Sequence, residues 1–331
     1  MRQYSNPVDK AMDLFADMMI KKLEGFKGEW EKPWFTNGEI SWPKNLAGRE
    51  YNGMNSLMLL LHCEKEGYKI PRFVTFEGVQ RLNNAGQPRV LINKGEKSFP
   101  VLLYRFYYIK KDTGEWISED TYELLDASAK EDYSRIPRYR VYYVFNVEQT
   151  NLRDVRPEMW QKLVDEYTFK KRKEGEIFSI DAVDEMIAED GWICLIKPQE
   201  QDACYYSIKR NEIVVPLKSQ FKDGESFYGT LFHEMVHSTG AKGALNRTMN
   251  TGFGTEEYAR EELVAELGAA LVCQLYGIEK YIREDSIAYL SSWLKHLRES
   301  PSYIRNVLAD VRKAVQLITK TIDEKEVVTA S

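Results

Sequence analysis

Histidine and cysteine are scarce in this sequence, which has four of each in 331 residues. The cysteines form no C-x-x-C pair, and the chain is far longer than the secreted domains that disulfides hold together. We therefore expect reduced and mostly buried thiols at Cys63, Cys194, Cys204 and Cys273. A hairpin would bring Cys194 and Cys204 together, but their spacing alone does not decide whether they bond.

Long apolar segments are absent as well. No run of 18 or more apolar residues occurs, so no segment has the composition of a transmembrane helix. The first residues, Met1 to Ser5, lack the charged and then apolar pattern of a secretory signal. These absences lead us to expect a soluble, cytoplasmic protein with no membrane partner. With 43% hydrophobic residues, the chain is long enough for two ordinary cores.

The net charge of -5 hides a difference between the two halves of the chain. Residues 1–150 carry 22 Lys and Arg against 21 Asp and Glu, whereas residues 151–331 carry 24 against 30. Eight of the acidic residues in the first half lie between Asp112 and Asp132. Outside that stretch, the first half has 21 basic and 13 acidic residues. The sequence thus predicts a modestly basic N-terminal domain that is interrupted by an acidic excursion.

Two of the four histidines lie four residues apart in His233-Glu234-Met235-Val236-His237. On a helix this spacing places both imidazoles on one face, with Glu234 beside them. Catalytic zinc takes three protein ligands and a water, whose pKa the ion lowers to about 7, so that a neighbouring carboxylate can act as a base. The motif therefore predicts a Zn2+ site with His233 and His237 as ligands, Glu234 as the general base, and peptide hydrolysis as the reaction.

We expect the third zinc ligand from a following helix. The longer motif H-E-x-x-H-x-x-G-x-x-H is excluded, because Gly243 stands where its last histidine would be. Residues 255–277 begin with an N-cap residue and end with a glycine, which predicts one helix. Within it, Glu262 is the expected ligand and Glu266 the carboxylate that orients a ligand histidine through its other ring nitrogen. Glu261 and Glu266 remain alternative ligands.

Other side chains bear on the same site. Four small residues between positions 265 and 270 would let this helix approach the histidine-bearing helix closely. Tyr258 and Arg260 are candidates for stabilising the oxyanion of the reaction, and the sequence does not decide between them. The other two histidines, His62 and His296, lie in apolar or amphipathic stretches, so we expect them to be packed or at the surface.

The apolar patterns predict an α+β fold with two domains, residues 1–152 and 153–331. The first domain would contain helices over 6–25, 56–67 and 76–85 and strands over 99–109 and 139–147. The second would contain helices over 180–189, 225–240, 255–277, 285–298 and 301–322 and strands over 192–197, 203–208 and 212–217. Pro216 suits a strand at the edge of a sheet. Such an edge either binds a peptide substrate by backbone pairing or is simply protected from aggregation.

Several segments are similar, in the same order, to segments of one known family. They are residues 45–55, 67–68, 71–76, 93–97 and 143–149 in the first half and residues 231–240 and 258–267 in the second. Through these segments nearly the whole chain resembles the ArdC-type antirestriction proteins of plasmids and conjugative elements, which also occur as N-terminal modules of TraC-like primases. The acidic excursion from Asp112 to Asp132 is longer than the connection usual in that family.

The resemblance implies an N-terminal domain that binds single-stranded DNA and a C-terminal metallopeptidase-like domain, which protect incoming DNA from host restriction. Single-strand binders combine basic side chains with aromatic faces on which bases stack. The candidates for such contacts are Trp42, Lys44, Arg49, Tyr51, Arg72, Phe73, Arg89, Lys94 and Lys97.

Two hypotheses follow for the function. The first is a DNA-associated zinc endopeptidase whose substrate is a protein or peptide, such as a component of a restriction system. The second is a single-stranded-DNA-binding protein that protects DNA by occupancy alone and has a structural or inactive zinc site. Glu234 favours the first hypothesis, because a purely structural site has no use for a carboxylate beside an open coordination position. Cleavage of the chain by itself is a third and narrower alternative.

Overall fold

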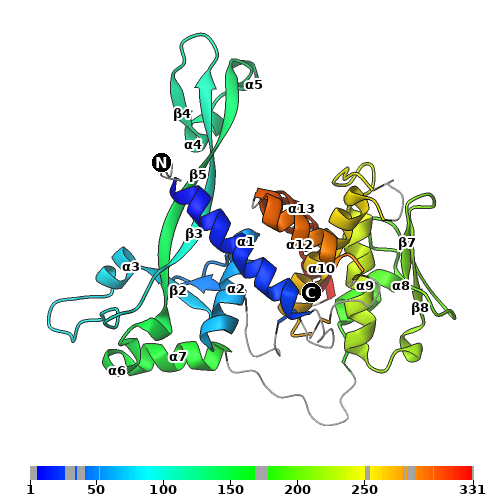
Figure 1. Ribbon diagram of the computed structural model, residues 1–331, viewed down its shortest axis with the longest axis horizontal. Coiled ribbons are helices and arrows are strands. Elements are labelled where there is room, and N and C mark those ends of the chain that lie inside the picture. Colours follow the sequence, from blue (N-terminus) through cyan, green and yellow to red (C-terminus); the bar gives the residue numbers. More distant parts are fainter. Residues whose placement is uncertain are drawn as a thin grey trace.

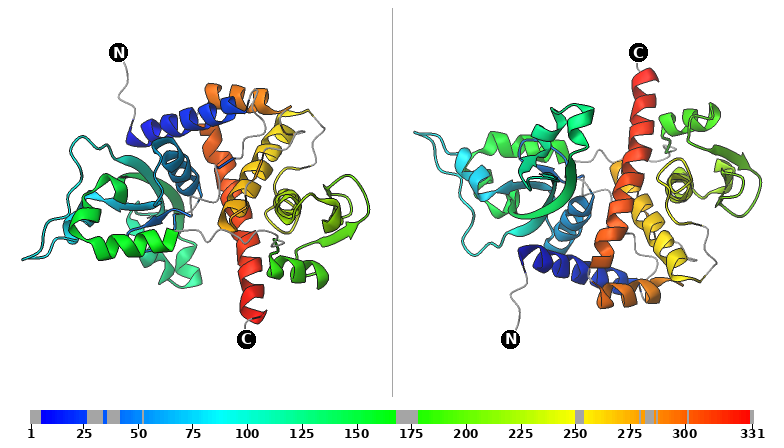
Figure 2. Two further views of the ribbon diagram at one scale, coloured as in Figure 1. Left: turned by 90° about the horizontal axis from the view of Figure 1, so that it is seen from below. Right: turned by 90° about the horizontal axis from the view of Figure 1, so that it is seen from above.

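The computed structural model describes residues 6–26, 34–35, 42–51, 53–167, 178–249, 254–278, 280–281, 286, 288–300 and 302–329. Two parts that mix helices and strands lie side by side, with helices α1 (Pro7–Gly25) and α13 (Ser302–Thr329) between them (Figures 1 and 2). The predicted α+β fold with two domains is therefore confirmed. Among the described residues, no helix is both long enough and apolar enough to cross a membrane.

The first part is built on a five-stranded sheet with the order β1-β2-β5-β3-β4. Its two long strands, β3 (Phe99–Lys110) and β5 (Tyr133–Asn146), pair antiparallel along the whole length of β3. The acidic excursion between them forms β4 (Trp116–Ser118) and two short helices, α4 (Glu119–Glu123) and α5 (Ala127–Lys130), at the far end of this hairpin (Figure 1). The remaining elements are β1 (Lys44–Asn45), α2 (Met54–Glu66), β2 (Arg72–Thr75), α3 (Phe76–Arg81), η1 (Val147–Gln149), α6 (Leu152–Val155) and α7 (Pro157–Tyr167).

Helix α7 packs on the first part of the protein. Leu163 and Tyr167 join a small buried apolar cluster with Val74 and Val79. Residues 157–167, which we assigned to the second domain from the sequence, thus lie against the first one. The reason is that the apolar face of α7 finds its partners on β2 and α3.

The second part contains a three-stranded sheet with the order β6-β8-β7. Strand β8 (Glu212–Pro216) pairs parallel with β6 (Leu195–Gln199) on one side and antiparallel with β7 (Tyr205–Ser207) on the other. The expectation that Pro216 marks an edge strand is therefore wrong. Proline is tolerated here because it is the last residue of β8 and lies beyond Val214, where the pairing of β8 with β7 stops. All four cysteines are free thiols, so Cys194 and Cys204 do not pair.

The helices of the second part carry its core. They are α8 (Asp181–Ala188), α9 (Gly224–Thr239), α10 (Glu256–Leu275), α12 (Leu290–Glu299) and α13. The predicted starts of the last two helices, Asp285 and Pro301, lie outside the described residues, and α13 continues to Thr329 instead of ending near Ile322.

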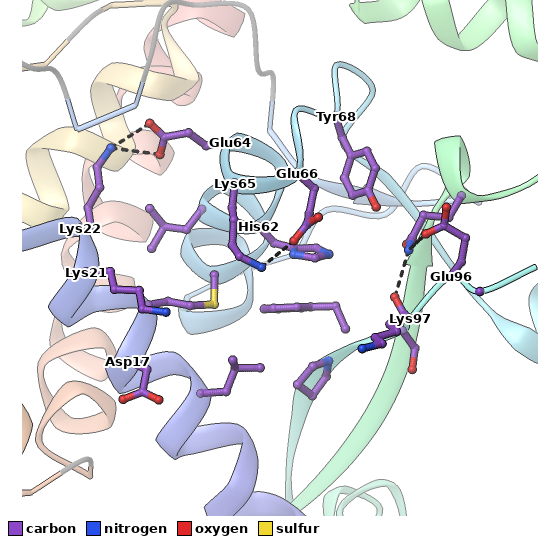
Figure 3. Close-up of a pocket in the computed structure, with 18 residues that line it drawn as sticks. Asp17, Lys21, Lys22, His62, Glu64, Lys65, Glu66, Tyr68, Glu96 and Lys97 are labelled. Carbon is purple, nitrogen blue, oxygen red and sulfur yellow. Dashed lines mark hydrogen bonds and ion pairs between the residues drawn. The ribbon is translucent and has the colours of Figure 1, made fainter. Parts of the chain in front are cut away.

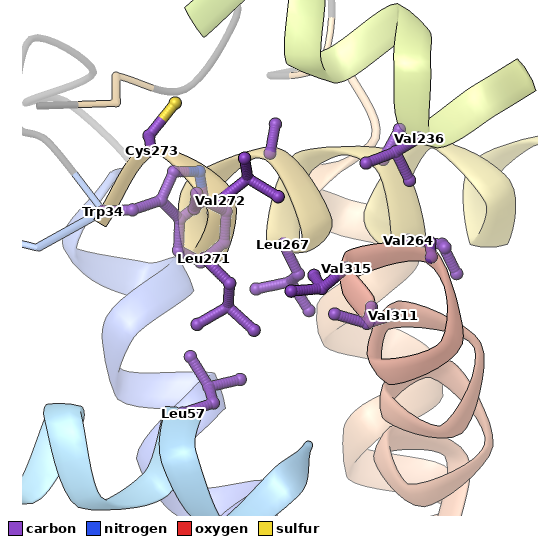
Figure 4. Packing of buried hydrophobic residues seen from close by; sticks show 14 of the residues in the cluster. Trp34, Leu57, Val236, Val264, Leu267, Leu271, Val272, Cys273, Val311 and Val315 are labelled. Atoms are coloured by element: carbon purple, nitrogen blue, oxygen red, sulfur yellow. The ribbon is translucent and has the colours of Figure 1, made fainter. Parts of the chain in front are cut away.

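Helix α10 lies between α9 and α13 and is almost wholly buried. At Gly268 a Cβ atom would lie 2.8 Å from Cγ2 of Val236 on α9, so the two helices approach closely only because this residue has no side chain. On the other side of α10, Leu267 and Leu271 extend toward Val315 of α13 and Leu57 of α2 (Figure 4). These residues belong to one continuous apolar cluster that includes α1 and α2, so the core extends through both parts.

Candidate metal centre

Helix α9 places two imidazoles at one point. Its N-cap residue, Asp223, accepts a hydrogen bond from the N–H of Ser226 at 2.7 Å, which fixes the first turn. Two turns later His233 and His237 follow on one face, with their Nε2 atoms 3.2 Å apart. Both rings are largely enclosed, because α10 covers this face of the helix.

Helix α10 brings a carboxylate to the same point. Glu262 lies 3.5 Å from Nε2 of His233 through one oxygen and 3.5 Å from Nε2 of His237 through the other. The ligand atoms of the three residues all lie within 4.8 Å of one another. The structure therefore brings together the three side chains that the sequence suggested as ligands. Two imidazole nitrogens and one carboxylate form a donor set that suits zinc.

The other ring nitrogen of each histidine faces a different carboxylate. Nδ1 of His233 lies 3.4 Å from Oε1 of Glu266, and Nδ1 of His237 lies 3.3 Å from Oε1 of Glu261. Carboxylates in these positions orient imidazoles and keep the Nε2 lone pair directed at a metal. Glu266 thus occupies the orienting position expected for it. Glu261 and Glu266, the alternative ligands, both contact the Nδ1 side of an imidazole. They therefore lie on the side of the rings opposite to the point where the Nε2 atoms converge.

Three further side chains hold Glu266 in place. Its Oε1 accepts a hydrogen bond from Ser286 Oγ at 2.9 Å, and its Oε2 accepts from Trp34 Nε1 at 3.2 Å and Lys280 Nζ at 3.4 Å. All of these groups are buried. The sequence did not reveal this network, because Trp34 precedes Glu266 by 232 residues and belongs to the other half of the chain.

Arg247 holds the second carboxylate, Glu261. The guanidinium donates to both carboxylate oxygens at 2.7 and 2.9 Å, and it also donates to the carbonyl oxygen of Val236 at 2.8 Å. Burial opposes the charged form of Glu261, but Arg247 and His237 outweigh it and lower its pKa. Burial likewise opposes a charged His237, but hydrogen bonding to Glu261 and the nearby carboxylates raise its pKa to about 9.

The expected general base, Glu234, lies beside the converging donors. Its Oε2 accepts a hydrogen bond from the backbone N–H of Tyr206 on β7 at 2.9 Å. Glu234, the two histidines and Glu262 line a cavity of about 220 Å³, together with residues of β7 and Tyr258. Tyr258 therefore stays a candidate for oxyanion stabilisation. Arg260 does not, because its side chain leaves this cavity and donates to Asp310 on α13 at 2.6 Å.

The two remaining histidines lie elsewhere. His296 stacks on Tyr303, and His62 stacks on Phe99 with ring centroids 4.2 Å apart. Both are thus packed against aromatic rings, as their apolar surroundings in the sequence indicated. Neither belongs to the cluster of side chains among the described residues that could hold a metal ion.

Three of the residues suggested for DNA contacts are buried. Phe73 has no exposed surface, Trp42 donates its indole N–H to the carbonyl of Tyr51 at 2.8 Å, and Arg72 forms an ion pair with Glu166. Burial gives these three residues structural roles and corrects the expectation that they contact DNA. The other six stay predictions, namely Lys44, Arg49, Tyr51, Arg89, Lys94 and Lys97.

Two sequence families match successive regions of the chain. Residues 9–145 match the N-terminal domain of the anti-restriction factor ArdC, and residues 181–309 match a zincin-like metallopeptidase. Over 318 residues the chain is 28% identical to a DNA primase TraC of Escherichia coli. That match covers 94% of this chain and 27% of the primase, so the chain spans about a quarter of that relative's length.

Solved structures of the antirestriction protein ArdC from plasmid R388 have the same fold. The metal-free crystal structure matches with a TM-score of 0.69 and 25% identity, over 95% of this chain and 98% of that one. The Mn(II)-bound crystal structure matches with a TM-score of 0.66 and 23% identity, over 94% and 97%. Because both regions match in order and the solved structure matches along nearly its whole length, the chain belongs to the ArdC-type antirestriction proteins, with an ArdC N-terminal domain followed by a zincin-like metallopeptidase domain.

Proposed function

We propose that the protein is a zinc-dependent peptidase that also binds single-stranded DNA and acts in antirestriction. The observation that carries the peptidase proposal is the convergence of His233, His237 and Glu262, with Glu234 beside them. The site fits zinc because its donors are two imidazoles and one carboxylate, and because each imidazole has a carboxylate at its other nitrogen. When bound there, zinc polarises a peptide carbonyl and acidifies a water molecule.

The side chains around the donors have distinct tasks in this proposal. Glu234 accepts a proton from the attacking water and passes it to the leaving amine. The N–H of Tyr206 orients that carboxylate through its Oε2 atom. Glu266 and Glu261 lie at the Nδ1 atoms of His233 and His237, where a carboxylate favours the tautomer that carries its proton on Nδ1 and presents Nε2 to the metal. The phenol of Tyr258, which lines the cavity, is the candidate donor to the oxyanion.

Strand β7 offers a place for the peptide substrate. It pairs with β8 along one edge, and no other strand of the described chain pairs with its second edge. Residues of β7, including Tyr205 and Tyr206, line the metal cavity. An extended peptide that adds to this edge would lie across the cavity, and backbone pairing would make its recognition tolerant of sequence.

The variant Glu234→Gln tests the proposal. The amide keeps the size of the side chain and an acceptor for Tyr206, but it does not take up a proton. We expect zinc content and DNA binding to stay unchanged and hydrolysis of a peptide library to fall by about 10²–10⁴-fold. Glu257→Gln, an exposed carboxylate at the start of α10, is the matched control and should retain full activity.

Antirestriction in cells separates the two functional hypotheses. If proteolysis is the mode of action, Glu234→Gln should lose protection of incoming DNA together with peptide hydrolysis. Unchanged protection by this variant would refute that role and favour protection by occupancy. Cleavage restricted to the chain itself would appear as fragments of the wild-type protein that Glu234→Gln lacks.

A further inference from the structure

A basic groove lies between the two parts of the protein. It is a cavity of about 880 Å³ with one wall from β3, β5 and the residues around the start of α2, and the other wall from α13. We call it the interdomain groove. Five basic residues line it, and Glu50 is the only acidic one. The five are Arg49, Arg135, Arg305, Arg312 and Lys313.

Most of these cations are not neutralised by the protein. No carboxylate of the described residues lies within ion-pair distance of Arg49, Arg135, Arg312 or Lys313. Glu50 lies 3.9 Å from Lys44, which already balances part of its charge. The groove therefore has an excess of positive charge that a polyanion would neutralise.

A second cavity has no such excess of positive charge. It has about 730 Å³ between α1, α2 and the start of β3, and four lysines and four carboxylates line it (Figure 3). Lys22 pairs with Glu64 at 3.0 Å and Lys65 with Glu66 at 2.6 Å. Its charges balance, so positive charge is concentrated in the interdomain groove and not in every cavity of the surface.

Aromatic side chains line the interdomain groove together with the cations. The guanidinium of Arg135 lies 3.2 Å from the ring centroid of Phe106. Tyr142 is 42% exposed, and Tyr51 is partly exposed beside Arg49. Cations interleaved with aromatic faces suit a single strand, because its unpaired bases can stack while its phosphates meet the basic side chains.

The two walls are held close together at Gly53. A Cβ atom there would lie 2.8 Å from Cδ of Arg312, and the residue has a positive φ of 61° that glycine adopts readily. The stem of Arg312 on α13 therefore rests against the backbone that leads into α2. The two walls of the interdomain groove are therefore in contact at this point.

We propose that single-stranded DNA binds in the interdomain groove, where α13 of the metallopeptidase-like part supplies Arg305, Arg312 and Lys313 and the N-terminal part supplies Arg49, Arg135 and the aromatic faces. This inference rests on the DNA-binding half of the proposed function and adds that both domains form the site. It also shifts the expected contacts, since of the residues suggested by the sequence only Arg49 and Tyr51 line this groove.

The test compares two double variants of the full, zinc-loaded chain. Arg312→Gln with Lys313→Gln removes two charges from the groove, and Lys209→Gln with Lys320→Gln removes two exposed charges outside it. Binding of a fluorescent oligothymidine is followed by anisotropy over a range of salt concentrations. Two lost phosphate contacts should weaken binding about 25-fold at 0.1 M salt and reduce the salt slope by about 1.4. The control should bind within about twofold of the wild type.

A second measurement does not depend on the variants folding. An oligothymidine that carries one 5-iodouracil should crosslink on irradiation to Tyr142 or Phe106 of the wild-type chain, as read by mass spectrometry. Equal affinities of the two double variants for the oligothymidine, or crosslinks confined to other surfaces, would overturn the proposal that single-stranded DNA binds in the interdomain groove. A wild-type chain that binds no single-stranded DNA would instead overturn the DNA-binding half of the proposed function. Binding of an acidic peptide in place of the oligonucleotide would also overturn the groove as a DNA site.

Discussion

The buried carboxylate of Glu266 gives the sharpest prediction for the metal centre. The variant Glu266→Gln removes its charge and replaces one acceptor oxygen by an NH2 donor. In the Oε2 position that donor would face the N–H of Trp34 and the ammonium of Lys280, which themselves donate, and in the Oε1 position it would displace the acceptor of the Ser286 hydroxyl. The ammonium of Lys280, only 6% exposed, loses its buried carboxylate partner.

Two magnitudes follow from this geometry. Removing one partner of a buried ion pair costs about 3–5 kcal/mol, so the free energy of unfolding of the zinc-free protein should fall by that amount. Loss of the carboxylate behind His233 should weaken zinc binding by about 10–100-fold. The two effects have different causes. The loss of stability comes from the ammonium of Lys280, which remains buried without its carboxylate partner. The loss of zinc affinity comes from the imidazole of His233, which no longer has a carboxylate at Nδ1.

A double variant separates the effect on stability from the effect on zinc binding. Glu266→Gln with Lys280→Met removes both charges, and it should regain most of the stability without regaining zinc affinity. Urea unfolding in the presence of a chelator measures the first quantity, and competition with a chromophoric chelator measures the second. If Glu266→Gln unfolds at the wild-type urea concentration and binds zinc equally well, the network described around Glu266 has no role. Recovery of zinc affinity by the double variant would refute the assignment of Glu266 to His233.

Two further predictions concern pH and packing. In the zinc-free protein the pKa of His237 is about 9 when folded, against about 6.5 when unfolded, so the folded state binds the proton more tightly. The contribution of the protonated His237 to the free energy of unfolding is therefore complete below pH 6.5 and is lost as the pH rises through 9. Urea unfolding of the wild type and of His237→Gln at several pH values measures this contribution. A difference in unfolding free energy between the two proteins that does not change with pH would contradict the prediction. Gly268→Ala should lower the free energy of unfolding by about 1–3 kcal/mol, because its Cβ would lie 2.8 Å from Val236 Cγ2. The added change Val236→Ala should restore part of this loss in thermal denaturation, and an unchanged or raised melting temperature for Gly268→Ala alone would contradict the close packing of α9 and α10.

Local patterns were enough to predict which side chains converge at the candidate metal centre. The i,i+4 spacing of His233 and His237 on one helix needs no knowledge of tertiary structure, and neither does the capped helix that carries Glu262. The helix expected over 255–277 is observed as Glu256–Leu275. Each of these features depends on residues close together in the chain.

Features that depend on distant contacts were missed or wrong. Strand β8 pairs with β7 on one side and with β6 on the other, and Pro216 alone could not show that its strand has two neighbours. Trp42 and Phe73 have the residue type required for base stacking, but the same aromatic rings also fill cores, and only tertiary packing distinguishes the two. The interdomain groove combines residues of α13 with residues some 200 positions earlier, which no local pattern predicts.

The large apolar cluster that runs from α1 and α2 into α10 and α13 also has a consequence for exchanging the two halves of the chain. If either half were exchanged for that of another protein, the apolar residues of the half that stayed, such as Leu57 or Leu271, would have to pack against new neighbours. We therefore expect the halves to melt in one cooperative transition and to be kept together in relatives, which agrees with the longer TraC primase, whose match includes both halves and covers 94% of this chain.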